Sequence, residues 1–211
     1  MYNIILFVIF IYMKVVAHRG LSQLWGDNTL VAFQKAVECG TFDALEVDIQ
    51  LDSCNEIIVK HDLYLDNTEE KLYLRDFFEH VKLPTHMKIF FDIKGSSDIV
   101  PILEDFFRDT ELDQYVFCSF NIKTLKNFRL PVTQGLITGN VLRESDLKNI
   151  LDNRIQYILV DFNFLDKEMT DYCWSLGLLV YTYTPRTQLE INHSVKYNID
   201  GIIINNEIHN I

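Results

Sequence analysis

Two histidines and three carboxylates occur in an order and spacing that suit acid–base chemistry beside a bound cation. His18 and His61 each follow a short apolar run, KVVA and EIIVK. Glu46 and Asp48 are two residues apart in ALEVDIQ, and Asp92 lies in KIFFDIK. Carboxylate oxygens can hold Mg²⁺ or Ca²⁺ and leave coordination positions open for substrate oxygens. Two imidazoles can give and take protons near neutral pH.

Two cationic side chains accompany these groups. Arg19 follows His18 directly, and Lys94 stands two residues after Asp92. Both can neutralise phosphate oxygens. Any one of these motifs alone is more typical of a turn or a surface, whereas their joint occurrence in this order indicates one site.

The pair Glu46 and Asp48 is expected on one face of a strand, because side chains along a strand alternate with period two. Like charges in one small volume repel and raise a pKa, and a hard divalent cation relieves that repulsion. The sequence therefore predicts a divalent cation, Mg²⁺ or Ca²⁺, as the cofactor.

The elements that must position these residues alternate between short apolar runs and longer amphipathic stretches, which indicates parallel strands and crossover helices. Strands are expected at 14–17, 44–50, 88–93, 115–119, 132–137, 157–160, 178–183 and 201–204, with a further extended run at 56–60. Helices are expected at 29–39, 76–81, 98–107, 122–128, 144–151, 167–176 and 188–197. Asn28 is the expected N-cap of the first helix. The pattern predicts a compact α/β fold, a (β/α)₈ barrel, whose functional side chains lie at the C-terminal ends of the strands.

Both ends of the chain depart from a regular barrel. Only seven residues follow the last strand, so no regular final helix is expected, and the connection 63–87 is a reduced insertion after strand two. Residues 1–12 are apolar but too short to cross a ~30 Å hydrocarbon core as a helix. Three interpretations stay open: an uncleaved leader or anchor that contacts a membrane, a segment packed on the barrel, or an extension upstream of a start at Met13. Residues 13–211 are expected to form one domain, located in the cytoplasm or at a membrane through the apolar segment.

Composition limits the partners. The chain has 211 residues, 48% of them hydrophobic, and a formal net charge of -11. That length and apolar content suit a single domain with a large core. The acidic charge repels nucleic acid, which is not expected as a partner, while a small anionic substrate is compatible with a local cation. The four cysteines show no C-x-x-C spacing, so free thiols are expected, with a disulfide left open.

Several stretches together resemble the glycerophosphodiester phosphodiesterase family. The most specific are VVAHRG, DNTLVAFQKAVECGTFDALEVDIQLD and IIVKHD, and the moderately specific ones are FFDIK, CSFNIKTLKNF, VYTYT and DGIIINN. The resemblance covers nearly the whole chain from residue 14. It implies metal-dependent hydrolysis of glycerophosphodiesters to sn-glycerol 3-phosphate and an alcohol.

The resemblance also implies roles for individual residues. His18 and His61 look like the general acid and base, and Arg19 and Lys94 look like the phosphate binders. The metal ligands it implies are Glu46, Asp48 and Asp92. We further expect a pocket lined by Ser119, Phe120, Tyr181 and Tyr183.

Departures from the family pattern leave other functions open. Asp92 stands where the family more often has Glu, Asn55 where a turn glycine is usual, and Tyr181 where a Trp is usual. The reduced insertion suggests an open mouth. An alternative is therefore lysophospholipase D or sphingomyelinase D-like cleavage of lysolipid or sphingolipid diesters, since those enzymes share an Asp-x-Lys element. A non-catalytic binding barrel is a third hypothesis, and it would require the loss of a catalytic group.

Overall fold

The computed structural model describes residues 13–63, 70–151 and 154–207. The apolar segment 1–12 lies outside the described residues, so its predicted roles stay predictions. Among the described residues no helix is both long and apolar enough to cross a membrane.

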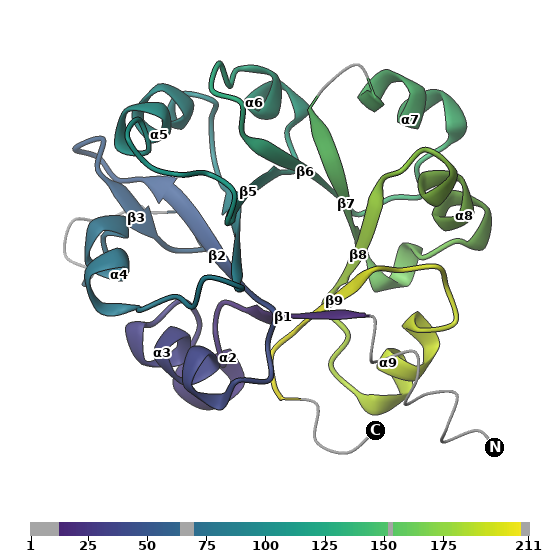
Figure 1. The fold of residues 1–211 in the computed structure, drawn as a ribbon, viewed down its shortest axis with the longest axis horizontal. Coiled ribbons are helices and arrows are strands. Elements are labelled where there is room, and N and C mark those ends of the chain that lie inside the picture. The colour runs from purple at the N-terminus through teal and green to yellow at the C-terminus, as the bar shows by residue number, and fades with distance from the viewer. Residues whose placement is uncertain (1–12, 64–69, 152–153, 208–211) are drawn as a thin grey trace.

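Eight parallel strands form a closed barrel (Figure 1). Their order is β1-β9-β8-β7-β6-β5-β4-β2, and pairing of β1 with β2 closes the ring. The strands are β1 (Lys14–His18), β2 (Ala44–Leu51), β4 (Lys88–Ile93), β5 (Tyr115–Ser119), β6 (Thr133–Thr138), β7 (Ile155–Asp161), β8 (Leu179–Tyr183) and β9 (Gly201–Ile204). A ninth strand, β3 (Ile57–Val59), pairs antiparallel with the end of β2. The predicted (β/α)₈ barrel is confirmed.

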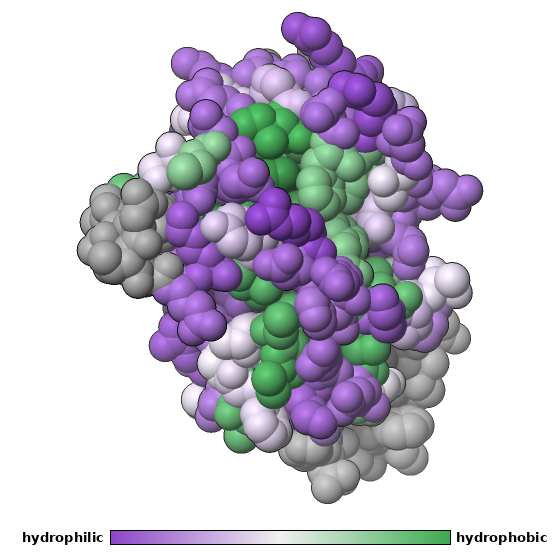
Figure 2. Space-filling view, turned by 90° about the vertical axis from the view of Figure 1, so that its left-hand side faces the viewer, coloured by the Kyte–Doolittle hydropathy of each residue, from purple (hydrophilic) through white to green (hydrophobic). Residues whose placement is uncertain are grey.

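Helices cover the outside of the ring. They are α2 (Ser22–Trp25), α3 (Leu30–Cys39), α4 (Leu74–His80), α5 (Ile99–Phe106), α6 (Ile122–Lys126), α7 (Glu144–Leu151), the 3₁₀ turn η1 (Phe162–Phe164), α8 (Lys167–Ser175) and α9 (Gln188–Ser194). The predicted helices lie within a few residues of these bounds, whereas α2 and η1 were not expected. Residues 205–207, which follow β9, form no helix. The side covered by α3 and α4 is largely hydrophilic, with hydrophobic residues showing in patches between (Figure 2).

Side-chain alternation along the strands decides what faces the barrel axis. In β2 the odd-numbered Leu45, Val47 and Ile49 pack in the cluster under the helices, while Ala44 packs with interior residues of other strands. Because side chains alternate, Glu46 and Asp48 follow Ala44 on the interior face. Both faces of β2 are buried, as is usual for a parallel strand between a barrel interior and its helices.

An aromatic cluster fills the barrel interior on the side of the N-terminal ends of the strands. The rings of Phe90, Tyr157 and Tyr181 lie with centroids 5.2–5.5 Å apart. A Cβ at Gly201 would lie 2.2 Å from the ring of Tyr181, so only glycine fits beside it. This cluster closes the barrel below the polar residues, and a site can therefore open only at the C-terminal ends of the strands.

The turn after β1 requires unusual backbone angles. Arg19 has φ 56° and Gly20 has φ 80°. A Cβ at Gly20 would lie 2.6 Å from the carbonyl carbon of Ala32 in α3. The glycine therefore lets α3 approach the end of β1 closely, which holds His18 and Arg19 at the mouth.

Two turn predictions have different outcomes. The N-cap of α3 is Thr29, whose hydroxyl accepts a hydrogen bond from the backbone N–H of Ala32 at 3.1 Å. The prediction of Asn28 as N-cap was wrong, because its side chain is used elsewhere. Asn55 has φ 61° and supplies the turn between β2 and β3, as predicted from its place where glycine is usual.

We expect Gly20→Ala to lower the free energy of unfolding by about 3 kcal/mol, because the methyl group adds a backbone clash to a left-handed φ. Gly40→Ala is the matched control. Gly40 has φ +68° but nothing within 4 Å of its would-be Cβ, so strain alone should cost about 1 kcal/mol. Urea unfolding of both variants measures the difference, and equal losses would contradict the clash.

Candidate active site

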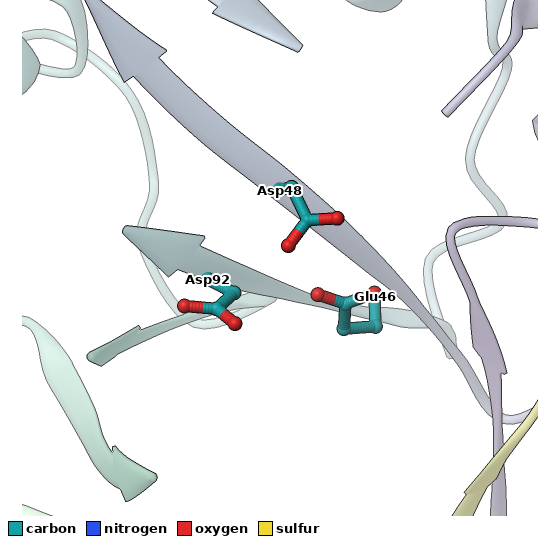
Figure 3. Close-up of side chains that lie close together, drawn as sticks. All are labelled: Glu46, Asp48 and Asp92. Carbon is teal, nitrogen blue, oxygen red and sulfur yellow. The ribbon is translucent and has the colours of Figure 1, made fainter. Parts of the chain in front are cut away.

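Strand register brings four of the predicted residues together. His18 lies opposite Glu46 in the β1–β2 pair, and Asp48 lies opposite Asp92 in the β2–β4 pair. The carboxyl groups of Glu46, Asp48 and Asp92 converge between neighbouring strands (Figure 3). One oxygen from each lies within 4.8 Å of the others.

Asp48 is the centre of the charge network. Its side chain is 1% exposed, its Oδ1 lies 3.0 Å from Lys94 Nζ, and its Oδ2 lies 2.9 Å from Arg19 Nε. Burial acts to raise the pKa of Asp48, but the Lys94 ammonium and the Arg19 guanidinium together hold that pKa below its usual value. Asp48 is therefore an anion that orients both cations.

Asn28 completes this network. It has φ 57°, a conformation that asparagine tolerates better than most residues. Its Nδ2 donates to Asp48 Oδ2 at 2.8 Å, and its Oδ1 accepts from the Asp48 backbone N–H at 3.3 Å. This double contact holds the carboxylate in place from the β1–α3 loop.

The other two carboxyl groups are less well compensated. Glu46 accepts a hydrogen bond from the Arg19 backbone N–H at 3.0 Å, and among the described residues no lysine or arginine forms an ion pair with it. Burial, followed by the charges of Asp48 and Asp92, raises the pKa of Glu46 well above its usual value. Burial also raises the pKa of Asp92 to about 6, although Lys94 Nζ lies 2.5 Å from its Oδ2.

The donor set fits a hard divalent cation. Three carboxylates from two adjacent strands offer oxygen ligands. Asp92 Oδ1 is buried and has no hydrogen-bond partner in the described structure. Since a buried acceptor without a partner is costly, a cation there would satisfy it and stabilise the ionised forms of Glu46 and Asp92.

The two histidines differ in environment. The side chain of His18 is 18% exposed, and burial followed by the charge of Arg19 lowers its pKa to about 4. Its Nδ1 lies 2.6 Å from Oδ1 of Asn205. His61 is 41% exposed, with its Nδ1 2.8 Å from Oδ1 of Asp62. His18 is therefore a neutral imidazole near pH 7.

A pocket of about 460 Å³ opens at the barrel mouth, and most of the predicted site residues line it. The predicted residues that line it are His18, Arg19, Glu46, His61, Asp92, Lys94, Phe120 and Tyr183. A second pocket of about 670 Å³ shares Arg19 and His61 with the first, so the mouth is broad on that side.

Two predicted lining residues lie elsewhere. Ser119 is buried, where its hydroxyl donates to the carbonyl of Ile93 and accepts from the backbone N–H of Asn121. Tyr181 lies in the aromatic cluster, one interior position below Tyr183 on β8. Ser119 and Tyr181, which we expected to line the pocket, are therefore not among the residues that border it in the described structure.

The sequence did not predict the far wall of the pocket or the partners of the main groups. The wall includes Asp161, the last residue of β7, and Phe162, Asn163, Arg186 and Glu190, which follow β7 and β8. The position of Asp161 at the end of a strand was the available signal. Asn28 and Asn205 carried none, because each acts on a residue far away in the sequence. A (β/α)₈ barrel that carries two histidines beside a carboxylate cluster at its mouth has the arrangement of an enzyme active site.

Comparison with known families identifies the class. Residues 18–126, more than half of the chain, match the Glycerophosphoryl diester phosphodiesterase family. The chain belongs to this family, which confirms the resemblance seen in the sequence.

The chain is also similar to several individual proteins. The chain is 38% identical over 98 residues to the uncharacterized protein YqiK of Bacillus subtilis, a match that covers 44% of this chain and only 38% of that protein. It is 23% identical over 227 residues to a glycerophosphodiester phosphodiesterase of Caldanaerobacter subterraneus, covering 90% and 92% of the two chains. The structure of an Oleispira antarctica phosphodiesterase in complex with the product sn-glycerol-3-phosphate superposes with a TM-score of 0.75 at 16% identity, covering 94% of this chain and 96% of that one.

Removing one charge at a time should separate the roles of the carboxylates. We expect Glu46→Gln to raise the free energy of unfolding of the metal-free protein by about 1 kcal/mol, because it removes a buried and poorly compensated charge. Asp48→Asn should lower it by about 2–3 kcal/mol, because Arg19 and Lys94 lose their shared anion. Urea unfolding in the presence of a chelator compares these isosteric variants. Shifts of the same sign would contradict the network described above.

Divalent cations should stabilise the protein more at about pH 8 than at about pH 5. The pKa of Asp92 in the folded protein, about 6, lies above its usual value of 3.8. The metal-free protein therefore loses stability as the pH rises through this window, and a cation restores it where the carboxylate is ionised. A cation at roughly a hundred times its Kd should raise Tm by about 5–10 °C at the higher pH.

Scanning calorimetry with Mg²⁺ or Ca²⁺ measures this shift. A monovalent salt at matched ionic strength is the control, since it screens charge without binding in the cluster. An equal shift at both pH values would contradict a site that includes Asp92.

Proposed function

We propose that the protein hydrolyses glycerophosphodiesters to sn-glycerol 3-phosphate and an alcohol, with a divalent cation and two histidines that transfer protons. One observation carries the proposal. A single pocket is lined by both histidines, by Arg19 and Lys94, and by two of the three clustered carboxylates. The third carboxylate, Asp48, forms ion pairs with Arg19 and Lys94. Membership of the family supports the choice of substrate.

The residues that would hold the cation are Glu46, Asp48 and Asp92. When bound, a Mg²⁺ or Ca²⁺ ion neutralises charge on the phosphate oxygens and polarises the phosphorus toward attack. The remaining chemistry belongs to the protein's own side chains.

Two imidazoles in opposite protonation states can carry out the reaction in two steps. The neutral imidazole takes the proton from a glycerol hydroxyl, whose oxygen bonds to phosphorus as the bond to the leaving oxygen breaks. The protonated imidazole gives its proton to that leaving alcohol. The product is a cyclic phosphate. Water then opens the ring with the two proton transfers reversed, which restores both imidazoles.

Arg19 and Lys94 neutralise the phosphate while Asp48 orients them. Arg19 has five N–H donors, of which Nε faces Asp48 and Nη1 lies 2.7 Å from Asp27. Lys94 Nζ contacts Asp48 and Asp92 and lies 5.8 Å from the ring of Phe120. Since both cations are tethered at the pocket edge, little side-chain entropy is lost when they meet a phosphate.

The apolar residues of the pocket support a second candidate, the cleavage of lysophospholipids. Phe120 is 55% exposed and packs edge-on against Tyr183, with ring centroids 6.2 Å apart. Phe162 also lines the pocket, and the buried Ile137, Leu159 and Ile203 line it from the barrel interior. These apolar surfaces suit the hydrocarbon of a lysolipid better than they suit a small polar alcohol.

A hydrolysis screen with Mg²⁺ or Ca²⁺ tests both candidates. We expect glycerophosphocholine to be cleaved faster than lysophosphatidylcholine, with sn-glycerol 3-phosphate as the product. His18→Ala and His61→Ala should each lower kcat/KM by about 10²–10⁴-fold, because each removes a proton-transfer group. Glu46→Ala should abolish the dependence on the cation.

His86→Ala is the matched control, since His86 is exposed and lies outside the pocket. Its kinetics should equal those of the unaltered protein. Faster cleavage of the lysolipid would favour the second candidate, and no cleavage of either diester would reject both and favour a binding barrel.

A further inference from the structure

The barrel seam places an amide against His18. Ala17 lies opposite Ile204 in the β1–β9 pair, so the next residues of the two strands, His18 and Asn205, meet at the mouth. Nδ1 of the imidazole lies 2.6 Å from Oδ1 of the amide. One short side-chain hydrogen bond thus joins the end of β1 to the residue that follows β9.

The chemistry of the amide oxygen fixes which imidazole nitrogen carries the proton. A carboxamide oxygen can only accept a hydrogen bond, so Nδ1 of His18 must donate it. In the neutral ring Nε2 then has a free lone pair. Nε2 lies 3.8 Å from Oε2 of Glu46, so the lone pair faces the carboxylate cluster.

The segment that carries Asn205 is itself held in place. Its carbonyl accepts from the backbone N–H of Gln23 in α2 at 3.5 Å, and Nδ2 of the neighbouring Asn206 donates to Oε1 of Gln23. The backbone of Asn205 is therefore tied to α2 while its side chain is directed to His18.

His61 lacks a comparable arrangement. Its Nδ1 faces the carboxylate of Asp62, an adjacent residue whose side chain is 87% exposed. A neutral amide oxygen that is itself held in place fixes a tautomer without adding charge, whereas Asp62 is an exposed carboxylate. The two histidines therefore differ in what holds their rings.

We propose that Asn205 is a positioning residue that holds His18 in the Nδ1–H tautomer, with Nε2 directed at the carboxylate cluster. In the reaction proposed above, on which this assignment of roles rests, His18 is then the imidazole that takes the proton in the first step. The amide itself does not touch the substrate.

The tautomer can be measured without any substrate. In ¹⁵N-labelled full-length protein at about pH 8, the imidazole ¹⁵N shifts should show Nδ1 protonated and Nε2 bare, with the signals assigned by their loss in His18→Gln. Asn205→Ala should give the mixed tautomers of a free imidazole. If Nε2 carries the proton in the unaltered protein, the amide has the opposite orientation and the proposal is overturned.

Kinetics supply the second readout. Asn205→Ala should lower kcat by about 10–100-fold with little change in KM, as expected for loss of a partner that orients a reacting group. Asn205→Asp should retain most of the activity and the Nδ1–H tautomer, because a carboxylate accepts the same hydrogen bond. Asn206→Ala is the matched control, since it removes an adjacent amide that contacts Gln23 instead of His18. Equal losses in Asn205→Ala and Asn206→Ala would overturn the proposal.

The two readouts separate this inference from the proposed function. A protein that cleaves none of the tested diesters but shows the Nδ1–H tautomer, lost in Asn205→Ala, keeps the positioning role and rejects the reaction. A protein that cleaves glycerophosphodiesters with Nε2 protonated keeps the reaction and rejects the positioning role.

Discussion

The repulsion among three buried carboxyl groups is the constraint around which this site is built. Glu46, Asp48 and Asp92 point into one small volume from two adjacent strands and are almost wholly buried, so water screens them little. The protein compensates Asp48 best, since this residue has Arg19, Lys94 and Asn28 as partners. The other two keep raised pKa values. The residual charge is a stability cost that prepares the barrel mouth for a cation.

The pairing with Asp48 also accounts for the position of Arg19 and Lys94 at the pocket. Asp48 lies behind Arg19 and Lys94 and fixes their direction from the barrel interior. Asp48 therefore has two opposite effects on the site: its charge adds to the repulsion among the carboxylates, and it holds Arg19 and Lys94 at the edge of the pocket.

Much of this arrangement was predictable from the sequence, because it depends on local periodicity. Alternation along a strand puts Glu46 and Asp48 on one face, and the interior position of Phe90 carries over to Asp92. The eight strands and most helices followed from the same patterns. Periodicity does not tell how deep in the barrel an interior residue lies. For this reason Tyr181 was expected in the pocket although it lies one layer lower, against Gly201.

Contacts between distant parts of the chain could not be predicted in this way. Asn28 looked like a helix cap, and only the folded structure shows its amide on Asp48. Ser119 looked like a pocket residue, but its hydroxyl serves the turn after β5. Nothing near Asn205 in the sequence points to His18, which is 187 positions away and becomes its neighbour only when the ring closes.

That closure has a consequence for how the protein matures. A chain ending just before residue 205 would still contain both histidines, the three acids and the two cations, yet it would lack the amide that meets His18. Ribosomal synthesis proceeds from the first strand to the last, so the two histidines, the three acids, Arg19 and Lys94, all within residues 18–94, are synthesised well before the amide at position 205. The nascent polypeptide therefore cannot form the contact between His18 and Asn205 until β9 has been synthesised and has closed the ring against β1.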